Sequence, residues 1–159
     1  PGKVSSAIKA SAALNALADI FEGSEKIIFS GLCADYALSV EAAKKLRDIT
    51  NFNALSLNLA EAENESEGFI KSSNVIAIIT NRELLPKALR ILRRLRARGA
   101  AVTIITSANI EEEISDFEGV ISFSDSIPLF NWVSAAACIY KAAVNAAPES
   151  KDAQEQRAV

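Results

Sequence analysis

The chain has 159 residues and a mass of 17.0 kDa, which is enough for one domain with a substantial hydrophobic core. Hydrophobic residues make up 50% and charged residues 23% of the chain, a balance that excludes a disordered protein. A net charge of −3 argues against nucleic-acid binding, and no apolar run reaches the roughly 20 residues of a membrane-spanning helix, so we expect a soluble domain with neither partner.

The first half of the chain alternates between helical and strand patterns. The predicted elements are a helix from Ser5 or Ser6 to about Phe21, a strand at 26–30, a helix at 37–50, a strand at 54–58 and an acidic, polar loop at 61–67 in which a turn of helix is the alternative. Gly23 ends the first helix, and Gly31 allows a tight turn after the first strand.

The second half continues the alternation. The predicted elements are a strand at 74–80, a helix at 83–98, a strand at 101–106, a short acidic helix at 109–116, a strand at 119–123 and a helix from 128 to about 146. Pro86 in the first turn and Gly99 just past the end are the expected helix boundaries of 83–98. We expect one domain over 1–147 and a polar, mobile tail over 148–159.

The strands are rich in Ile and Val on both faces, which is typical of a sheet covered by helices on both sides. The sequence therefore predicts a three-layer α/β/α sandwich with a mainly parallel sheet and right-handed, Rossmann-like crossovers. In such folds ligands bind outside the carboxyl ends of the strands.

The segment after the first strand is a candidate ligand loop, with Gly31, Cys33, Asp35 and Tyr36 as its candidate residues. Its backbone N–H groups suit an anion, although Asp35 would repel one, and an ordinary turn is the alternative. Gly31 is the only glycine of this segment, whereas the dinucleotide-binding pattern needs three spaced glycines, so that pattern is absent. Cys33 could be a reactive thiol, but no base accompanies it.

Polar side chains also follow two later strands. Thr80, Asn81 and Arg82 can contribute a hydroxyl, an amide and a guanidinium to a phosphorylated ligand, or Thr80 or Asn81 caps the next helix. Thr106 and Ser107 add hydroxyls at a further strand end, where ordinary loop structure is the alternative.

Three charged residues, Glu41, Lys45 and Asp48, share one face of the helix at 37–50. A carboxylate and an ammonium there can move a proton in an isomerisation, whereas the alternative is a surface ion pair. The basic residues of 83–98 surround an apolar stripe, which favours a solvated amphipathic helix.

Histidine is absent, which excludes imidazole catalysis, Ser-His and Cys-His nucleophile pairs and histidine metal sites. The two distant cysteines, Cys33 and Cys138, suggest neither a zinc site nor a disulfide, so the cytoplasm is the expected location. We expect no metal and no cofactor. No secretory signal follows Pro1, and a removed initiator methionine or a segment of a longer protein fits this start.

Two long segments carry a family resemblance: IIFSGLCADYALSVEAAKKLRDI (27–49) and VIAIITNRELLPKALRILRRLRARGAAVTIIT (75–106). They resemble the sugar isomerase (SIS) domain family, in particular the second SIS domain of glutamine:fructose-6-phosphate amidotransferase. Gly31, Tyr36, Glu41 and Asn81 agree with that domain, and the resemblance covers most of the chain.

The resemblance implies candidate roles and also departures. The family's proton-moving helix glutamate falls on Asp48. If the domain is an isomerase or a deaminase of phosphosugars, we expect Asp48 to be the base and Lys45 a charge stabiliser. The family's His-Gly-Pro loop falls on 64–66, so its histidine is missing, and its C-terminal lysine has no counterpart in 149–159. Pro1 cannot replace an amino-terminal cysteine nucleophile, so no glutaminase function is expected.

The expected function is a SIS-type domain that binds a phosphosugar or another carbohydrate derivative, as a homodimer or beside a second SIS domain. Three alternatives remain open. The domain is a phosphosugar isomerase or an aminosugar-phosphate deaminase, or it is a degenerate SIS domain acting as a sensor or oligomerisation module, or it is a nucleotide-binding Rossmann-like domain.

Overall fold

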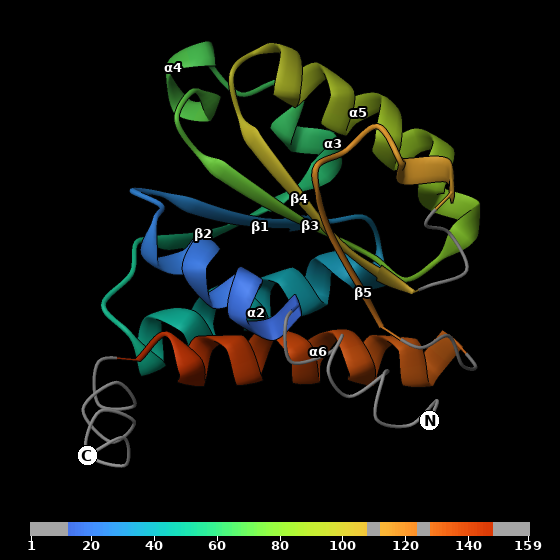
Figure 1. Cartoon of the computed structure of the whole chain (residues 1–159). Coiled ribbons are helices and arrows are strands. Elements are labelled where there is room, and N and C mark those ends of the chain that lie inside the picture. The colour runs from blue at the N-terminus through green and yellow to red at the C-terminus, as the bar shows by residue number, and fades with distance from the viewer. Residues whose placement is uncertain (1–12, 108–111, 124–127, 148–159) are drawn as a thin grey trace, which may run out of the picture.

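A parallel sheet forms the centre of the structure, a computed structural model that describes residues 13–107, 112–123 and 128–147 (Figure 1). Its strands are β1 (Ile27–Gly31), β2 (Ala54–Asn58), β3 (Asn74–Ile79), β4 (Ala101–Ser107) and β5 (Gly119–Phe123). They lie in the order β2-β1-β3-β4-β5, and every pair of neighbours is parallel.

Helices cover both faces of this sheet. The helices are the residues 13–22, α2 (Ala34–Ile49), α3 (Leu59–Ala62), α4 (Glu67–Ile70), α5 (Leu85–Ala97) and α6 (Pro128–Asn145). Helix 13–22, α2 and α6 lie below the sheet in Figure 1, and α3, α4 and α5 lie above it. The predicted three-layer sandwich is confirmed.

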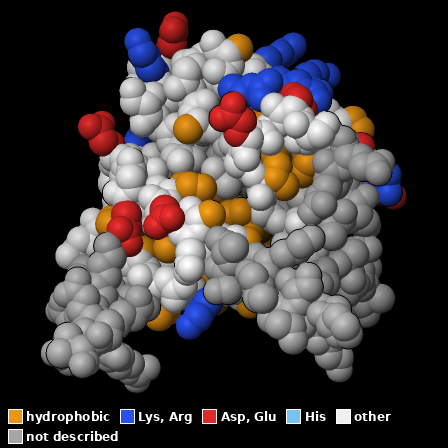
Figure 2. Space-filling model, viewed as in Figure 1, with side chains coloured by type: hydrophobic (Ala, Val, Ile, Leu, Met, Phe, Trp, Pro, Cys, Tyr) orange, Lys and Arg blue, Asp and Glu red, His pale blue; other side chains and the backbone are white. Residues whose placement is uncertain are grey.

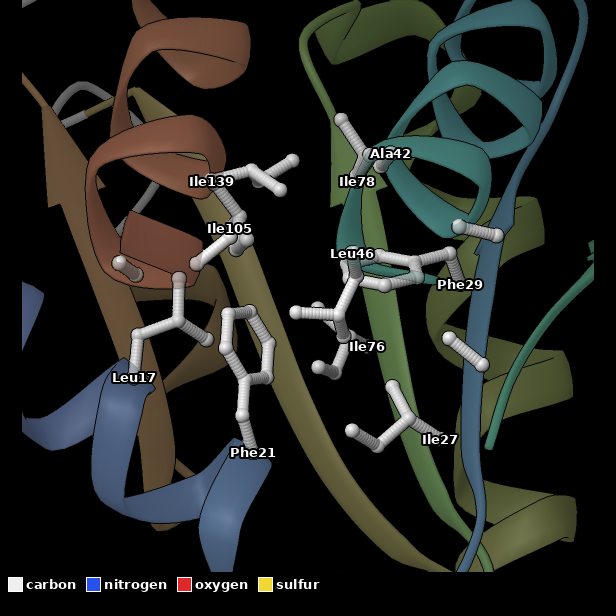
Figure 3. Packing of buried hydrophobic residues seen from close by; sticks show 14 of the residues in the cluster. Leu17, Phe21, Ile27, Phe29, Ala42, Leu46, Ile76, Ile78, Ile105 and Ile139 are labelled. Atoms are coloured by element: carbon white, nitrogen blue, oxygen red, sulfur yellow. The ribbon is translucent and has the colours of Figure 1, made fainter. Parts of the chain in front are cut away.

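Alternating side chains of the buried strands build two separate cores. Along β1, Ile27 and Phe29 pack with helix 13–22, α2 and α6, whereas Ile28 packs on the α5 side. Figure 3 shows the first core, in which labelled residues from β1, β3 and β4 point toward residues from the three covering helices. Phe21 meets Phe29 edge to face, with 6.0 Å between the ring centroids. A strand buried on both faces explains why its sequence shows an apolar run and no alternation.

The start of α2 differs from the prediction. The helix begins at Ala34, three residues before the predicted start, so Asp35 and Tyr36 lie in its first turn and not in a loop. Cys33 precedes the helix with a φ of 52° and forms no side-chain cap, so the sequence carried no capping signal there. The turn before α2 is so tight that a Cβ on Gly31 would lie only 2.6 Å from the carbonyl carbon of Asp35.

The acidic stretch 61–67 also differs from the predicted polar loop. Its two ends lie in short helices, α3 and α4, which Asn58 and Ser66 cap by accepting hydrogen bonds from Ala60 N and Phe69 N. Helices of four residues are too short to show a periodic apolar pattern, which is why the sequence did not reveal them.

Other boundaries follow the sequence closely. The helix predicted at 83–98 begins as a 3-10 turn, Arg82–Leu84, and continues as α5. Of the helix predicted at 109–116, the structure describes a 3-10 turn at Glu112–Ile114. The cap at Ser5 or Ser6 and the tail 148–159 lie outside the described residues. Among the helices in the described ranges, none is long and apolar enough to cross a membrane.

Candidate functional site at the carboxyl edge of the sheet

The strand order reverses between β1 and β3. From β1 the chain continues to β2 on one side, and the later strands β3, β4 and β5 follow on the other side. In doubly wound sheets this reversal opens a crevice at the carboxyl ends of the two strands, where ligands bind. The predicted loop residues after β1 and β3 lie at this point, so the topology brings Gly31, Asp35 and Thr80 to one edge.

A buried carboxylate links the segments that follow β1 and β3. The Asp35 side chain accepts hydrogen bonds from the Thr80 backbone N–H at 3.0 Å and from the Thr80 hydroxyl at 2.6 Å. Asp35 is only 3% exposed. The contact connects the first turn of α2 to the segment that follows β3, 45 positions along the chain. Burial raises the pKa of Asp35 above its ordinary value, while hydrogen bonds from Thr80 and Asn81 act in the opposite direction.

The other polar side chains at this edge also bond within the chain. The Thr106 hydroxyl donates to the Ile79 carbonyl at 2.8 Å, and the Ser30 hydroxyl donates to the Leu57 carbonyl at 2.8 Å. Ser107 is buried at the end of β4. In the part of the chain that the structure describes, no buried side-chain nitrogen or oxygen lacks a hydrogen-bond partner.

The remaining predicted loop residues have separate roles or stay at the surface. Asn81 caps the 3-10 turn, since its side chain accepts a hydrogen bond from Glu83 N at 2.9 Å, which confirms the capping alternative for this residue. Arg82 is exposed and forms a salt bridge with Glu113. Cys33 is exposed beside the crevice, and Tyr36 is partly buried.

Asp48 and Lys45, the predicted catalytic pair, lie far in space from the contact between Asp35 and Thr80 of the same chain. Because α2 rises about 1.5 Å per residue, Asp48 is about 20 Å along the helix axis from Asp35, toward the opposite edge of the sheet. Asp48 pairs with Lys44 at 4.0 Å, and Lys45 pairs with Glu41 at 3.9 Å. Both are surface ion pairs, and the catalytic roles of Asp48 and Lys45 stay predictions.

Two hollows of the described surface lie at the opposite, amino edge. One of about 490 Å³ is lined by the start of β4, Arg96 and Phe117, and one of about 320 Å³ lies beside Gly23 and Asn74. In the first, the Arg96 guanidinium stacks over Phe117 at 4.8 Å from the ring centroid and bonds to Asp116. At the carboxyl edge, residues 108–111 and 124–127, which follow β4 and β5, lie outside the described ranges.

Three arginines of α5, Arg93, Arg94 and Arg96, bond to acidic neighbours within the chain. Arg93 holds Asp116 through two hydrogen bonds of 3.0 Å and keeps the pKa of that carboxyl below its ordinary value, and Arg94 pairs with Glu63. Figure 2 shows these basic side chains gathered over α5 with an acidic side chain among them. The predicted solvated, amphipathic helix is therefore what the structure shows.

Within the described ranges, no group of three or more Cys, Asp or Glu side chains is arranged to hold a metal ion.

Sequence reasoning missed the pairing of Asp35 with Thr80. Each residue was a candidate, but their separation in the chain hides the contact. The only usable signal was positional, since each residue lies just after a strand and those strands are neighbours in a 2-1-3 order.

The comparisons with known sequences point to one group of enzymes. The chain is 29% identical over 122 residues to glutamine–fructose-6-phosphate aminotransferase of Shewanella oneidensis and 26% identical over 113 residues to that of Francisella tularensis. These matches cover 76% and 70% of the chain but 20% and 18% of the relatives, so the chain spans about one fifth of their length. No family model matches the chain.

Solved structures share the fold. The C-terminal domain of glucosamine-fructose-6-phosphate aminotransferase from Francisella tularensis has a TM-score of 0.80 and 21% identity, over 93% of this chain and 42% of that one. The sugar isomerase domain of an RpiR transcription factor from Sphaerobacter thermophilus has a TM-score of 0.65 and 13% identity, over 92% and 85%. The Vibrio vulnificus NanR protein complexed with ManNAc-6P has a TM-score of 0.63 and 15% identity, over 99% and 67%.

The sequence relatives and the shared fold agree with the resemblance seen in the two long segments of the sequence. The chain is therefore similar in sequence to glutamine–fructose-6-phosphate aminotransferases and shares its fold with the sugar isomerase domain of the RpiR transcription factor.

Proposed function

We propose that this chain is a SIS-type domain that binds a phosphosugar or another carbohydrate derivative at the carboxyl edge of its sheet. The observation that supports this most directly is the position of Thr80, Thr106 and Ser107, which lie at the carboxyl ends of the neighbouring strands β3 and β4. Hydroxyl groups suit the hydroxyls of a sugar. The related fold of NanR, which was solved with ManNAc-6P, favours the same class of ligand.

A titration tests this proposal. We expect fructose 6-phosphate or an aminosugar phosphate to raise the melting midpoint and to shift the backbone amide signals of residues 80–82 or 106–107 in an NMR spectrum. A dinucleotide is the control for the Rossmann-like alternative. A flat response to every phosphosugar would contradict the proposal.

Catalysis by this chain is a separate question. If the domain is a phosphosugar isomerase or an aminosugar-phosphate deaminase, Asp48 is the proposed base and Lys45 the charge stabiliser. We propose to follow fructose 6-phosphate conversion by NMR in the unaltered protein and in Asp48→Asn. Equal turnover in the two proteins would remove Asp48 from the mechanism.

A non-catalytic SIS module is the second candidate function. It is favoured by the exposed position of Asp48, whose side chain is 54% exposed and pairs with Lys44, and by the absence of histidine from the chain. Absent turnover together with clear phosphosugar binding would support a sensor, because the ligand would then bind without being changed.

The α6 surface favours pairing with a second copy or a second SIS domain. Lys141 is the only charged residue of α6, and Val133 and Val144 on it are 53% and 45% exposed. Val40 on the neighbouring α2 is 43% exposed. Apolar side chains exposed on adjacent helices are typical of an interface. Light scattering of the unaltered protein and of Val133→Glu tests this, and a monomer in both cases would contradict a homodimer.

A further inference from the structure

The contact between Asp35 and Thr80 lies at the carboxyl ends of β1 and β3, the place where doubly wound sheets bind their ligands. We propose that Asp35 is an autoinhibitory residue, whose carboxylate occupies the hydrogen-bond donors of Thr80 and so excludes a ligand phosphate from the crevice between β1 and β3. The inference rests on the proposed function for the identity of the ligand, whereas the blocked donors can be tested with inorganic phosphate alone.

The chemistry of the contact supports this role. The Thr80 N–H and hydroxyl both donate to one carboxylate, and a phosphate oxygen is the same class of acceptor as a carboxylate oxygen. A second anion beside a buried carboxylate would be strongly repelled, because charges interact more strongly where water is excluded. The crevice therefore cannot hold Asp35 and a phosphate on the same donors.

The backbone around Asp35 is held in place. The Asp35 N–H donates to the Leu32 carbonyl at 3.1 Å, and its own carbonyl accepts from the Ser39 hydroxyl at 2.8 Å. Gly31 lies so close to this backbone that it has no room for a side chain. Access to the Thr80 donors thus requires the Asp35 side chain to rotate away, not the turn to move.

The fold keeps this carboxylate buried in spite of the cost of removing it from water. Burial raises the pKa of Asp35, even though Thr80 and Asn81 supply bonds that favour the charged form. A residue that served packing alone would fill this position better with an apolar side chain.

The test is a titration of ¹⁵N-labelled protein with inorganic phosphate, followed through the amide signals of Thr80 and Asn81. In Asp35→Ala we expect these signals to shift in a saturable way, with an affinity at least about tenfold higher than in the unaltered protein, since the competing acceptor is gone. Asp19→Ala is the matched control, because Asp19 is an exposed aspartate on helix 13–22 and its loss changes the net charge equally. Asp19→Ala should respond as the unaltered protein does.

Two results would overturn the proposal: equal phosphate shifts at Thr80 with and without the Asp35 carboxylate, or no shift in folded Asp35→Ala. If Asp35→Ala does not fold, Asp35→Ser replaces it, since serine is well accepted at a helix start and the substitution removes the carboxylate from the Thr80 donors. An unchanged phosphate affinity in folded Asp35→Ser would then reject the autoinhibitory role.

A parallel titration with fructose 6-phosphate separates this inference from the proposed function. Phosphate binding at Thr80 in Asp35→Ala without any phosphosugar response in either protein would support the autoinhibitory contact and reject the phosphosugar proposal. Fructose 6-phosphate that shifts Thr80 equally in both proteins would support phosphosugar binding and reject the autoinhibitory contact.

Discussion

The two ends of α2 each carry an aspartate, and the surroundings of the two carboxylates are opposite. Asp35, at the start, is 3% exposed and bonded to Thr80 across the crevice. Asp48, at the end, has a 54% exposed side chain and a long ion pair with Lys44. Desolvation thus affects the first carboxylate strongly, while water screens the second. Where a helix starts and ends relative to the sheet decides which of its carboxylates is buried and hydrogen-bonded and which is exposed to water.

The largest expected effect comes from closing the space beside Asp35. In Gly31→Ala the new Cβ would lie 2.6 Å from the carbonyl carbon and 2.7 Å from the carbonyl oxygen of Asp35, so the first turn of α2 has to shift. We expect a loss of about 3 kcal/mol in the free energy of unfolding, measured by urea denaturation.

Gly68→Ala is the control for this substitution, because a Cβ at Gly68 in α4 meets no atom within 4 Å. Its stability should be unchanged or slightly higher, since alanine favours a helix. Similar losses in both variants would show that the close approach at Gly31 is not what matters.

Removal of the buried carboxylate should have the next largest effect. Asp35→Ala leaves the N–H and the hydroxyl of Thr80 without their acceptor, so we expect a loss of about 2 kcal/mol in the free energy of unfolding. Thr80→Ala, which loses only the hydroxyl bond, should cost less. A greater loss in Thr80→Ala than in Asp35→Ala would contradict the central place of the carboxylate.

The pH dependence should reveal the raised pKa of Asp35. The folded protein holds the Asp35 proton more tightly than the unfolded chain does, so protonation of Asp35 stabilises the folded state. This stabilisation is fully present below the ordinary pKa of 3.8. It is lost as the pH rises through the folded pKa. The difference in free energy of unfolding between the unaltered protein and Asp35→Asn should therefore fall with rising pH across that window, as urea denaturation at a series of pH values will show. A difference that rises with pH would mean that the folded pKa is depressed.

The smallest effect should come from the other end of the helix. Asp48→Ala removes one weak, exposed ion pair, so the free energy of unfolding should change by less than about 0.5 kcal/mol. Urea denaturation at low and high salt measures this, and the change should be smaller still at high salt. A loss as large as that in Asp35→Ala would remove the contrast between the two ends.

Much of the candidate site could be predicted one residue at a time. Thr80 and Asn81 follow a strand, and Gly31 follows another, so their place at the carboxyl edge comes from strand and turn patterns. The role of each side chain was predictable only in part. The cap formed by Asn81 is local and was one of its two predicted roles. The pairing of Arg82 with Glu113 was not predictable, because these residues come together only in the fold.

By itself, the sequence determined the strands, most helix boundaries and the layered fold, because runs of Ile and Val and the spacing of apolar residues are local consequences of burial. Only the tertiary structure decided that Asp35 is buried and Asp48 exposed, and that Asp35 bonds to Thr80. The physical reason is that β1 and β3 become neighbours through the strand order, and a contact between residues 45 positions apart leaves no periodic trace in the sequence.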